Sequence, residues 1–462
     1  MKDTKPLPFQ KEDYEKMVAL KGRVLLSWEM GLGKTFGFLY FMKHMKLKRV
    51  IIVCPAGLKR QWRSQAKEHF GIKCHILYHK QPYNREKLRL AINRGEPLII
   101  NYDILEKWVP FLKTLKPQII CGDEIHMCGE IRTKRTQYFK ILCVDVPMVF
   151  GLSGTPILNK PWELFPILHI LQPQKYNSPF SYGMSFCDAE KSWGKWKFNG
   201  ARNLDKLHAQ LKKDCLIRRT MEEVLPNLPP KRRIIVPLEI SNHKEYAKAE
   251  KDLISWLASF DIGKATRAMR AERWVKMTYL KRLAASLKLP SIKEWIESFL
   301  GESDNKLLLG MWHRDLIEDI YSEFKSISVV IHGGVSTKER WKAEKAILKD
   351  KNTRILIGQI KSCGVGLNLP DLTAGLGEFP WNPGTCAQFE GRVRRLTSKK
   401  RSDVYYFVAA NTVEEKICDI LQRKSKICDK VLDGVASRKD SLLIMDELQK
   451  ELQRGASYVA KA

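Results

Sequence analysis

The residues with the clearest chemistry form the stretch Trp28-Glu29-Met30-Gly31-Leu32-Gly33-Lys34-Thr35. An apolar run precedes it and a helical pattern follows it, which predicts a strand, a glycine loop and a helix in succession. Glycines let backbone N–H groups turn toward a phosphate, and the helix N-terminus adds positive potential. Lys34 would then reach the β- and γ-phosphates of a nucleotide while Thr35 holds magnesium. The alternative is an ordinary turn that leads into a helix. The spacing departs from the common phosphate-binding loop, because Trp28 occupies the position of that loop's first glycine.

A pair of carboxylates is the second chemical signal. Asp123 and Glu124 directly follow the apolar run 118–122, which predicts a buried strand. One carboxylate can hold the water shell of magnesium, and its neighbour can orient or deprotonate the attacking water. Such pairs are common at strand ends, so this pair gains its meaning from the phosphate loop earlier in the chain.

Two more motifs would complete a nucleotide site. Gln10 precedes the loop and is placed to read the adenine edge with its amide, although by itself it would be a surface residue. Arg392 and Arg395 are three residues apart, so we expect them on the same side of a helix. A guanidinium brought to the γ-phosphate from another lobe neutralises charge that develops during transfer. The alternative for these arginines is another basic surface helix.

Short apolar runs alternate with helical segments in two sections of the chain. This pattern predicts an α/β fold with parallel sheets, whose strand carboxyl ends carry the ligand site. The second section begins near Lys306 and predicts a lobe of similar size without a phosphate loop of its own. The expected domains are a first lobe over 1–235 with the ATP-binding motifs and a helical protrusion at 158–216, a helical protrusion or linker over 236–300, a second lobe over 301–436 with the arginines, and a C-terminal helix and tail over 437–462.

The charge of the chain predicts a polyanionic partner. Its 462 residues carry a formal charge of +30, with lysine and arginine spread over the whole length. Such a surplus raises the local concentration of nucleic acid and makes binding salt-dependent, although a merely soluble basic protein is the alternative. Lys264, Arg267 and Arg270 recur at three-residue spacing on a predicted helix. They are expected either to track a DNA backbone or to form a solvated face.

Composition argues against several other classes of protein. No apolar run is long enough to span a bilayer, and the residues after Met1 lead into no secretory h-region, so we expect no membrane association. The 11 cysteines form no Cys-x-x-Cys pair, which argues against a zinc site and for reduced thiols in a cytoplasmic protein.

Several motifs, taken in order, resemble those of superfamily-two helicases: residues 7–10, 29–35, 123–126, 153–156, 364–368 and 388–395. The stretches 30–35 and 380–383 look like those of Swi/Snf-type translocases. The stretches 186–189, 217–219 and 228–232 are similar to annealing helicases of the HARP type, which remodel stalled forks, and a motor this compact also resembles phage branch-migration helicases. The resemblance covers about residues 6–433.

The resemblance implies two RecA-like parallel-sheet lobes with helical protrusions between them, ATP and magnesium in a cleft, and duplex DNA across both lobes. It assigns catalysis to Lys34, Asp123, Glu124, Arg392 and Arg395, and magnesium to Thr35 and Asp123. Nucleotide contacts fall on Gln10, Met30, Gly31, Leu32, Gly33, Lys34, Thr35, Gly366 and Gln388. DNA contacts fall on Pro55, Ser153, Thr155, His332, Gly333, Lys361 and Ser362, where Ser153 and Thr155 would also couple hydrolysis to movement.

The expected function is therefore an ATP-dependent DNA translocase that remodels forked or branched DNA by branch migration, fork regression or strand annealing. A motor that displaces proteins from duplex DNA and a non-catalytic nucleic-acid clamp are the alternatives. We expect it to act as a monomer on DNA, with replication or recombination proteins as partners, in a bacterial or viral setting or in a eukaryotic nucleus. Three departures leave the subfamily open, namely Trp28, Ile125 and residues 396–398.

Overall fold

The computed structural model describes residues 5–228, 231–258, 266–364, 366–398 and 400–435. The chain divides into two compact units, which are described one at a time. The first comprises Met1–Leu228 with Lys424–Lys439, and the second comprises Pro229–Arg423 with Asp440–Ala462. Within the described residues, no helix has both the length and the apolar character needed to cross a bilayer.

The first unit is built on a parallel seven-stranded sheet in the order β3-β4-β2-β5-β6-β1-β9. The five strands between the two edge strands are almost wholly buried, as expected for a parallel sheet covered by helices on both faces. They run over β1 Arg23–Trp28, β2 Val50–Cys54, β3 His75–Ile76, β4 Leu98–Asn101, β5 Ile119–Asp123, β6 Met148–Leu152 and β9 Leu216–Arg219.

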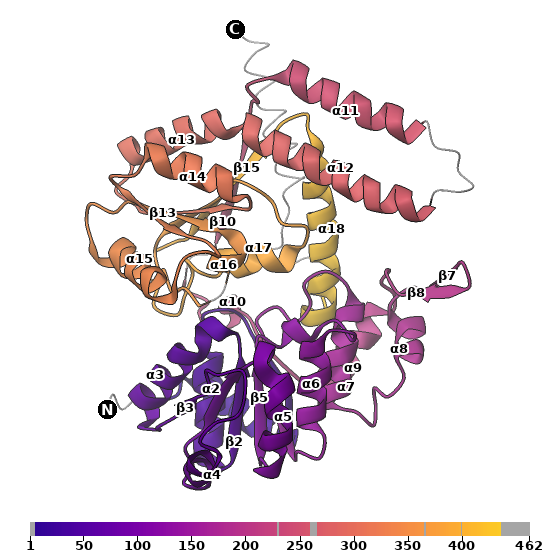
Figure 1. Cartoon of the computed structure of the whole chain (residues 1–462), viewed down its shortest axis with the longest axis vertical. Helices are drawn as coiled ribbons and strands as arrows, with labels where there is room; N and C mark the ends of the chain where they lie inside the picture. Colours follow the sequence, from indigo (N-terminus) through magenta and orange to yellow (C-terminus); the bar gives the residue numbers. More distant parts are fainter. Residues whose placement is uncertain (1–4, 229–230, 259–265, 365, 399, 436–462) are drawn as a thin grey trace. The chain divides into compact units, whose positions relative to one another are not determined.

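Helices cover this sheet, and a small antiparallel hairpin projects from the same unit (Figure 1). The α-helices are α1 Pro8–Ala19, α2 Lys34–His44, α3 Lys59–Phe70, α4 Arg85–Asn93, α5 Leu105–Thr114, α6 Lys134–Cys143, α7 Leu164–Leu171, α8 Pro179–Phe186, α9 Leu204–Asp214 and α10 Met221–Val224. Short 3-10 turns are η1 Ala56–Leu58, η2 Tyr102–Ile104, η3 Ile125–Cys128 and η4 Pro161–Glu163, and the hairpin is β7 Glu190–Ser192 with β8 Lys195–Lys197.

The second unit is a six-stranded parallel sheet in the order β10-β15-β14-β11-β13-β12. The strands are β10 Arg232–Leu238, β11 Leu307–Met311, β12 Ser328–Ile331, β13 Ile355–Gln359, β14 Thr373–Leu376 and β15 Asp403–Ala409. The helices are α11 His243–Ala258, α12 Thr266–Leu287, α13 Leu289–Glu302, α14 Arg314–Glu323, α15 Thr337–Lys349, α16 Ile360–Cys363, α17 Pro383–Glu390 and α18 Val413–Asp433. The last residues of α18, from Lys424, are counted with the first unit.

The predicted α/β class with two parallel sheets is confirmed, and the differences lie between residues 158 and 237. The predicted helical protrusion over 158–216 contains the hairpin as well as helices, and the residues that follow it contribute β9 to the first sheet and β10 to the second. The expected boundary after residue 235 falls inside β10, because this strand pairs along its full length with β15. The predicted tail over 437–462 lies outside the described residues.

A buried ion pair joins helix and sheet in the second unit. Lys288, between α12 and α13, places Nζ 2.6 Å from a carboxylate oxygen of Glu414, and both side chains are fully buried. The same ammonium donates to the Phe407 carbonyl at 2.6 Å, and Glu414 also accepts the Ala409 N–H at 2.9 Å. A buried pair of this kind becomes costly when one partner is removed, because the other charge is left uncompensated.

We therefore expect Lys288→Met to destabilise the second unit by about 3–5 kcal/mol. Hydrogen exchange of the β15 amides measures this loss locally. The control is Lys293→Met, which removes pairs with the half-exposed Asp319 and Glu323 and should cost at most about 1 kcal/mol. Equal protection of β15 in the two variants would contradict the prediction.

Candidate functional site

The glycine loop lies between β1 and α2, in the order that the sequence predicts. Gly31 and Gly33 have φ angles of 88° and 80°, a left-handed backbone that glycine adopts without steric cost. Gly33 directly precedes α2, so the backbone N–H groups of the loop lie at the N-terminus of this helix. A Cβ at Gly33 would lie 3.2 Å from the Gln10 amide nitrogen, so glycine also permits a close approach there.

Lys34 and the residues behind it close the cradle. Its ammonium donates to the carbonyls of Trp28 at 3.0 Å and Glu29 at 3.5 Å, across the loop. A Cβ at Gly154 would lie 3.2 Å from Lys34 Nζ and 2.9 Å from Met30 Cγ. The loop after β6, which contains the predicted residues Ser153 and Thr155, therefore abuts the cradle.

Gln10 is not the surface residue that its position alone suggested. It is buried on α1, where its Oε1 accepts the Leu7 N–H at 2.9 Å and its Nε2 donates to the Leu32 carbonyl at 3.3 Å. The alternative of a surface residue is excluded because α1 packs against the glycine loop. The amide is thereby held at the cradle, where a base-reading role requires it.

Trp28, the departure from the common loop, is a core residue. Its Nε1 donates to the buried Asp13 carboxylate at 2.8 Å, and its ring fills the space that a side chain at Gly37 would need, with a Cβ there 2.5 Å away. Asp13 also accepts from Arg219 at 2.7 Å. These contacts tie α1, β1 and β9 together under the cradle. Asp13 is not among the predicted site residues, and its signal in the sequence is a carboxylate three residues after Gln10.

The two carboxylates lie at the end of β5, next to the end of β6. Asp123 Oδ2 accepts from Trp62 Nε1 at 2.8 Å, and Oδ1 accepts the Glu124 N–H at 3.0 Å. Burial, together with the negative charge of Glu124, raises the pKa of Asp123 to about 6, while Trp62 and Lys34 act in the opposite direction. A divalent cation would offset this clustered negative charge, so the residues present fit magnesium bound through one carboxylate and nucleotide phosphates.

A chain of polar contacts connects the carboxylates to the loop after β6. Glu124 has a left-handed backbone with φ 51°, and its Oε2 lies 3.3 Å from His126 Nδ1. The same nitrogen lies 3.1 Å from Ser153 Oγ, which accepts the Thr155 N–H at 3.2 Å. A change at Glu124 can therefore reach residues 153–155 through two contacts.

Arg218 holds this arrangement from β9, and it is not among the residues for which the sequence predicts a role. Its Nη1 donates to the carbonyls of Ser27 and Gly154, both at 3.0 Å, so it joins the strand before the cradle to the loop after β6. Its Nε pairs with Asp433 on α18 at 2.8 Å. The feature of the sequence that could have pointed to Arg218 is its position at the end of a short apolar run.

In the second unit the two predicted arginines converge on one carbonyl. Arg392 Nη1 and Arg395 Nη2 both donate to the Leu367 carbonyl, at 3.2 and 2.7 Å. Arg392 also donates to the Gly364 carbonyl at 2.8 Å. Their expected place on a helix was wrong, because α17 ends at Glu390, Arg392 follows in a turn and Arg395 in irregular chain. They still point to the same side, toward the loop that contains Gly366, whose φ is 80°.

A buried carboxylate beside these arginines was missed. Glu390 is fully buried and accepts from Lys231 at 2.6 Å, from Arg233 at 2.7 and 2.8 Å, and from the Tyr406 hydroxyl. Burial by itself raises the pKa of Glu390, but the charges of Arg233 and Lys231 outweigh it and hold the pKa well below its usual range. Glu390 thus fixes the end of α17 to the start of β10.

The remaining predicted residues lie at strand ends or on helices. Pro55 follows β2, and Ser153 and Thr155 follow β6, on the sheet edge that also carries Asp123. In the second unit, His332 and Gly333 follow β12, while Lys361 and Ser362 are on α16 directly after the neighbouring β13. The other predicted positions are Gln388 on α17, Thr35 on α2, Arg267 and Arg270 on α12, and Lys264, which lies outside the described residues.

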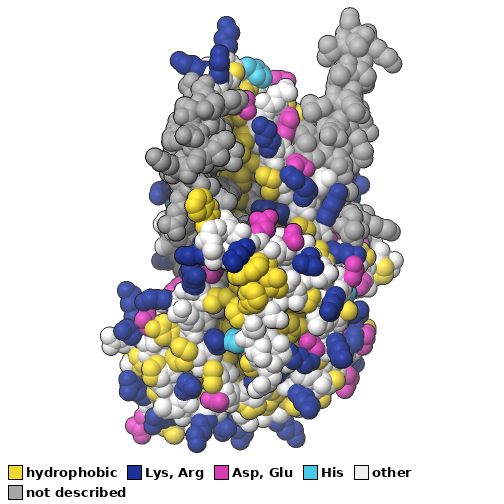
Figure 2. All heavy atoms as spheres, turned by 90° about the vertical axis from the view of Figure 1, so that its right-hand side faces the viewer, with side chains coloured by type: hydrophobic (Ala, Val, Ile, Leu, Met, Phe, Trp, Pro, Cys, Tyr) yellow, Lys and Arg dark blue, Asp and Glu magenta, His cyan; other side chains and the backbone are white. Residues whose placement is uncertain are grey.

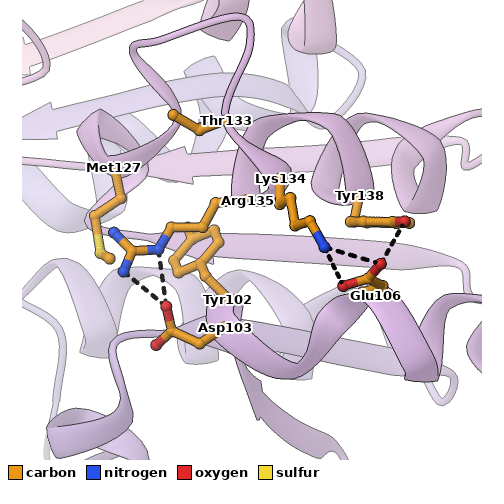
Figure 3. A pocket seen from close by; sticks show the side chains of 8 residues that line it. All are labelled: Tyr102, Asp103, Glu106, Met127, Thr133, Lys134, Arg135 and Tyr138. Carbon is orange, nitrogen blue, oxygen red and sulfur yellow. Dashed lines mark hydrogen bonds and ion pairs between the residues drawn. The ribbon is translucent and has the colours of Figure 1, made fainter.

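A pocket of about 310 Å³ is a separate feature of the first unit (Figure 3). Two ion pairs shape it, Arg135 with Asp103 at 2.7 Å and Lys134 with Glu106 at 3.1 Å. It shares one wall residue with the candidate site, because the Tyr102 hydroxyl donates to the Asp123 carbonyl at 2.9 Å. The predicted nucleotide and DNA residues do not line it.

The Glu390 network predicts a pH effect on the second unit. A carboxyl whose pKa is lower in the folded state stabilises fully above its unfolded pKa of about 4.3, and this stabilisation is lost as the pH falls below that value. We expect Glu390→Gln to cost about 3–5 kcal/mol at pH 7 and to flatten the stability of this unit between about pH 4 and pH 2.

Urea unfolding of the second unit, followed by hydrogen exchange at several pH values, measures both effects. The matched control is Glu297→Gln, at an exposed position on α13. An acid transition as steep in Glu390→Gln as in the wild type would refute the assignment.

The chain has relatives among known proteins. The family described as SNF2-related domain matches residues 9–286. "DNA annealing helicase and endonuclease ZRANB3" of Bos taurus is 27% identical over 95% of this chain and 41% of its own length. "SWI/SNF-related matrix-associated actin-dependent regulator of chromatin subfamily A-like protein 1" of Drosophila melanogaster is 28% identical over 92% of this chain and 56% of its own. The chain thus spans about half the length of these relatives.

A solved structure, "Sulfolobus solfataricus SWI2/SNF2 ATPase core in complex with dsDNA", aligns with 94% of each chain at 19% identity and a TM-score of 0.44. A likeness of this degree adds nothing to what the strand orders of the two units show.

Proposed function

This chain belongs to the family of SNF2-related domains, and on that premise we propose that it is a DNA-dependent ATPase that moves along duplex DNA and remodels forks or branches. The observation that carries the proposal is the chain of contacts from Glu124 through His126 to Ser153, next to the glycine cradle. The curated relatives named for annealing helicase activity support the branched substrate.

The first unit supplies the groups that bind and activate the nucleotide. The loop N–H groups and Lys34 hold the phosphates of ATP, and Gln10 is held where it can read the base. Thr35 and Asp123 would hold magnesium, which would offset the negative charge of the nucleotide phosphates. Glu124 orients the attacking water, and its contact with His126 fixes the carboxylate.

The same contacts offer a route from hydrolysis to movement. Loss of the γ-phosphate changes the charge that Glu124 and Lys34 face, and His126 passes this change to Ser153. Ser153 holds the Thr155 N–H, so the loop that we assign to the DNA backbone responds. Arg392 and Arg395 of the second unit stabilise the transferring phosphoryl group.

The proposed partners follow from charge and family. DNA is the partner, in accord with the charge of +30, and we propose that the protein works as a monomer alongside replication or recombination proteins. Its place is the compartment that holds the DNA, either a bacterial cytoplasm or a eukaryotic nucleus.

We expect Lys34→Ala to lower DNA-stimulated ATP hydrolysis by on the order of 100-fold, because a charge aimed at the phosphates is removed. Phosphate release is measured without DNA and with duplex, forked and single-stranded DNA. Lys87→Ala, at an exposed position on α4, is the charge-matched control and should match the wild type. If DNA did not stimulate ATP hydrolysis by the wild type, the translocase proposal would be refuted. If Lys34→Ala were fully active, the glycine loop with Lys34 would not be the phosphate-binding site.

We expect Arg395→Ala to lower the maximal hydrolysis rate by on the order of 1,000-fold while ATP binding stays within about threefold, since an arginine finger acts on the transition state. Binding of a fluorescent ATP analogue and single-turnover hydrolysis separate the two effects. Arg401→Ala removes an exposed arginine six residues further along and should leave both unchanged. Weaker ATP binding with an unchanged rate would show that Arg395 is not a finger.

A further inference from the structure

The hairpin β7–β8 presents tryptophan at its tip. Trp193 is 81% exposed and Trp196 is 41% exposed, although both side chains are large and apolar. The hairpin projects from the first unit in Figure 1, and Figure 2 looks onto that side of the molecule, where hydrophobic side chains gather with Lys and Arg around them. Exposed apolar groups of this size are characteristic of surfaces that bind a partner.

Neither folding nor turn chemistry explains Trp193. The turn residues Trp193 and Gly194 have φ angles of 53° and 71°, the pair of positive values that a two-residue hairpin turn requires. Asparagine, aspartate or glycine suits the first of these positions, whereas a bulky side chain there is sterically disfavoured. Burial of the indole does not offset this steric cost, because the side chain is exposed. We therefore look for its role in binding to another molecule.

A row of aromatic rings holds the hairpin in place. Trp196 lies edge-on to Phe180 with ring centroids 5.5 Å apart, and Phe198 stacks on Trp162 at 4.6 Å. The Phe198 ring also lies against the backbone of α8, since a Cβ at Gly183 would be 2.3 Å from it. An isolated two-stranded hairpin is marginally stable, so these contacts are what keep the tip extended.

The charges around the tip favour an anionic partner. Residues 188–202 contain four cationic side chains and two acidic ones, so the segment has a net charge of +2. Lys191 is opposite Trp196 across the strands, and Lys195 is opposite Ser192, so exposed lysines flank the tip on both faces of the hairpin. Lysines placed this way suit phosphate groups, and an aromatic side chain suits the face of a base.

We propose that the hairpin tip binds DNA at a branch point, with Trp193 stacked on an unpaired base and Lys191 and Lys195 on the adjoining phosphates. The proposal rests on the proposed function, because it takes DNA as the partner. A base exposes its face to a side chain where it is unpaired, whereas a continuous duplex covers it by stacking. The tip would therefore add affinity for forks over plain duplex.

The test uses the full chain and a fork with 2-aminopurine as the unpaired base at the branch, beside a duplex of equal length and the same salt concentration. We expect wild-type protein to change the 2-aminopurine fluorescence by stacking. Trp193→Ala should lose that change and bind the fork about 5- to 150-fold more weakly, the range for one stacked base. Trp193→Phe should retain most of both.

Two controls make the result specific. Trp341→Ala removes an indole that is 61% exposed on α15 and should bind the fork as the wild type does. Duplex binding and duplex-stimulated ATP hydrolysis of Trp193→Ala should be unchanged, which also shows that the variant folds. If Trp193→Ala bound the fork and changed the 2-aminopurine fluorescence as the wild type does, the proposal would be overturned. The partner of the tip would then be a protein. Equal losses on fork and duplex would overturn base stacking, whereas a wild type without DNA-stimulated hydrolysis fails the proposed function instead.

Discussion

The candidate site depends on the electrostatics of two adjacent carboxylates at the end of a buried strand. Burial raises the pKa of Asp123, and the charge of Glu124 adds to the effect. Trp62, the Glu124 N–H and Lys34 offset part of this cost, and each belongs to a different element of the first unit. The strand order β2-β5-β6-β1 makes this possible, because parallel strands deliver all their carboxyl ends to one edge.

The second unit uses the same physical device for a different purpose. Glu390 is a buried charge that is compensated by Lys231 and Arg233 at the start of β10, and it fixes the chain directly before the two arginines. Arg392 and Arg395 in turn hold the Leu367 carbonyl. Each group has more than one partner, and removing one of them would leave a buried charge or carbonyl less fully compensated, so the segment from α17 to Arg395 is held as a unit.

The hairpin differs from both of these regions, because its outer residues add little to the fold. Phe198 and Trp196 anchor it through ring contacts, whereas Trp193 occupies a turn position that disfavours its bulk. Trp196 and Phe198 therefore have a structural role, whereas Trp193 has none that the fold explains and is available to a ligand. Sequence patterns did not show the hairpin, since its strands are three residues each and mostly polar.

Local features of the sequence were enough to predict the two parallel sheets, the glycine loop and the carboxylate pair. Apolar runs and glycines with positive φ express their preferences among near neighbours in the chain, so they can be recognised without a structure. The burial of Gln10, the turn position of Arg392 and the strand β10 were decided by tertiary packing. The contacts responsible join residues far apart, such as Asp13 with Arg219, 206 positions away, and Glu390 with Lys231, 159 positions away. Only the strand order, with the burial that it imposes, brings such partners together, because nothing in the local chain favours one distant partner over another.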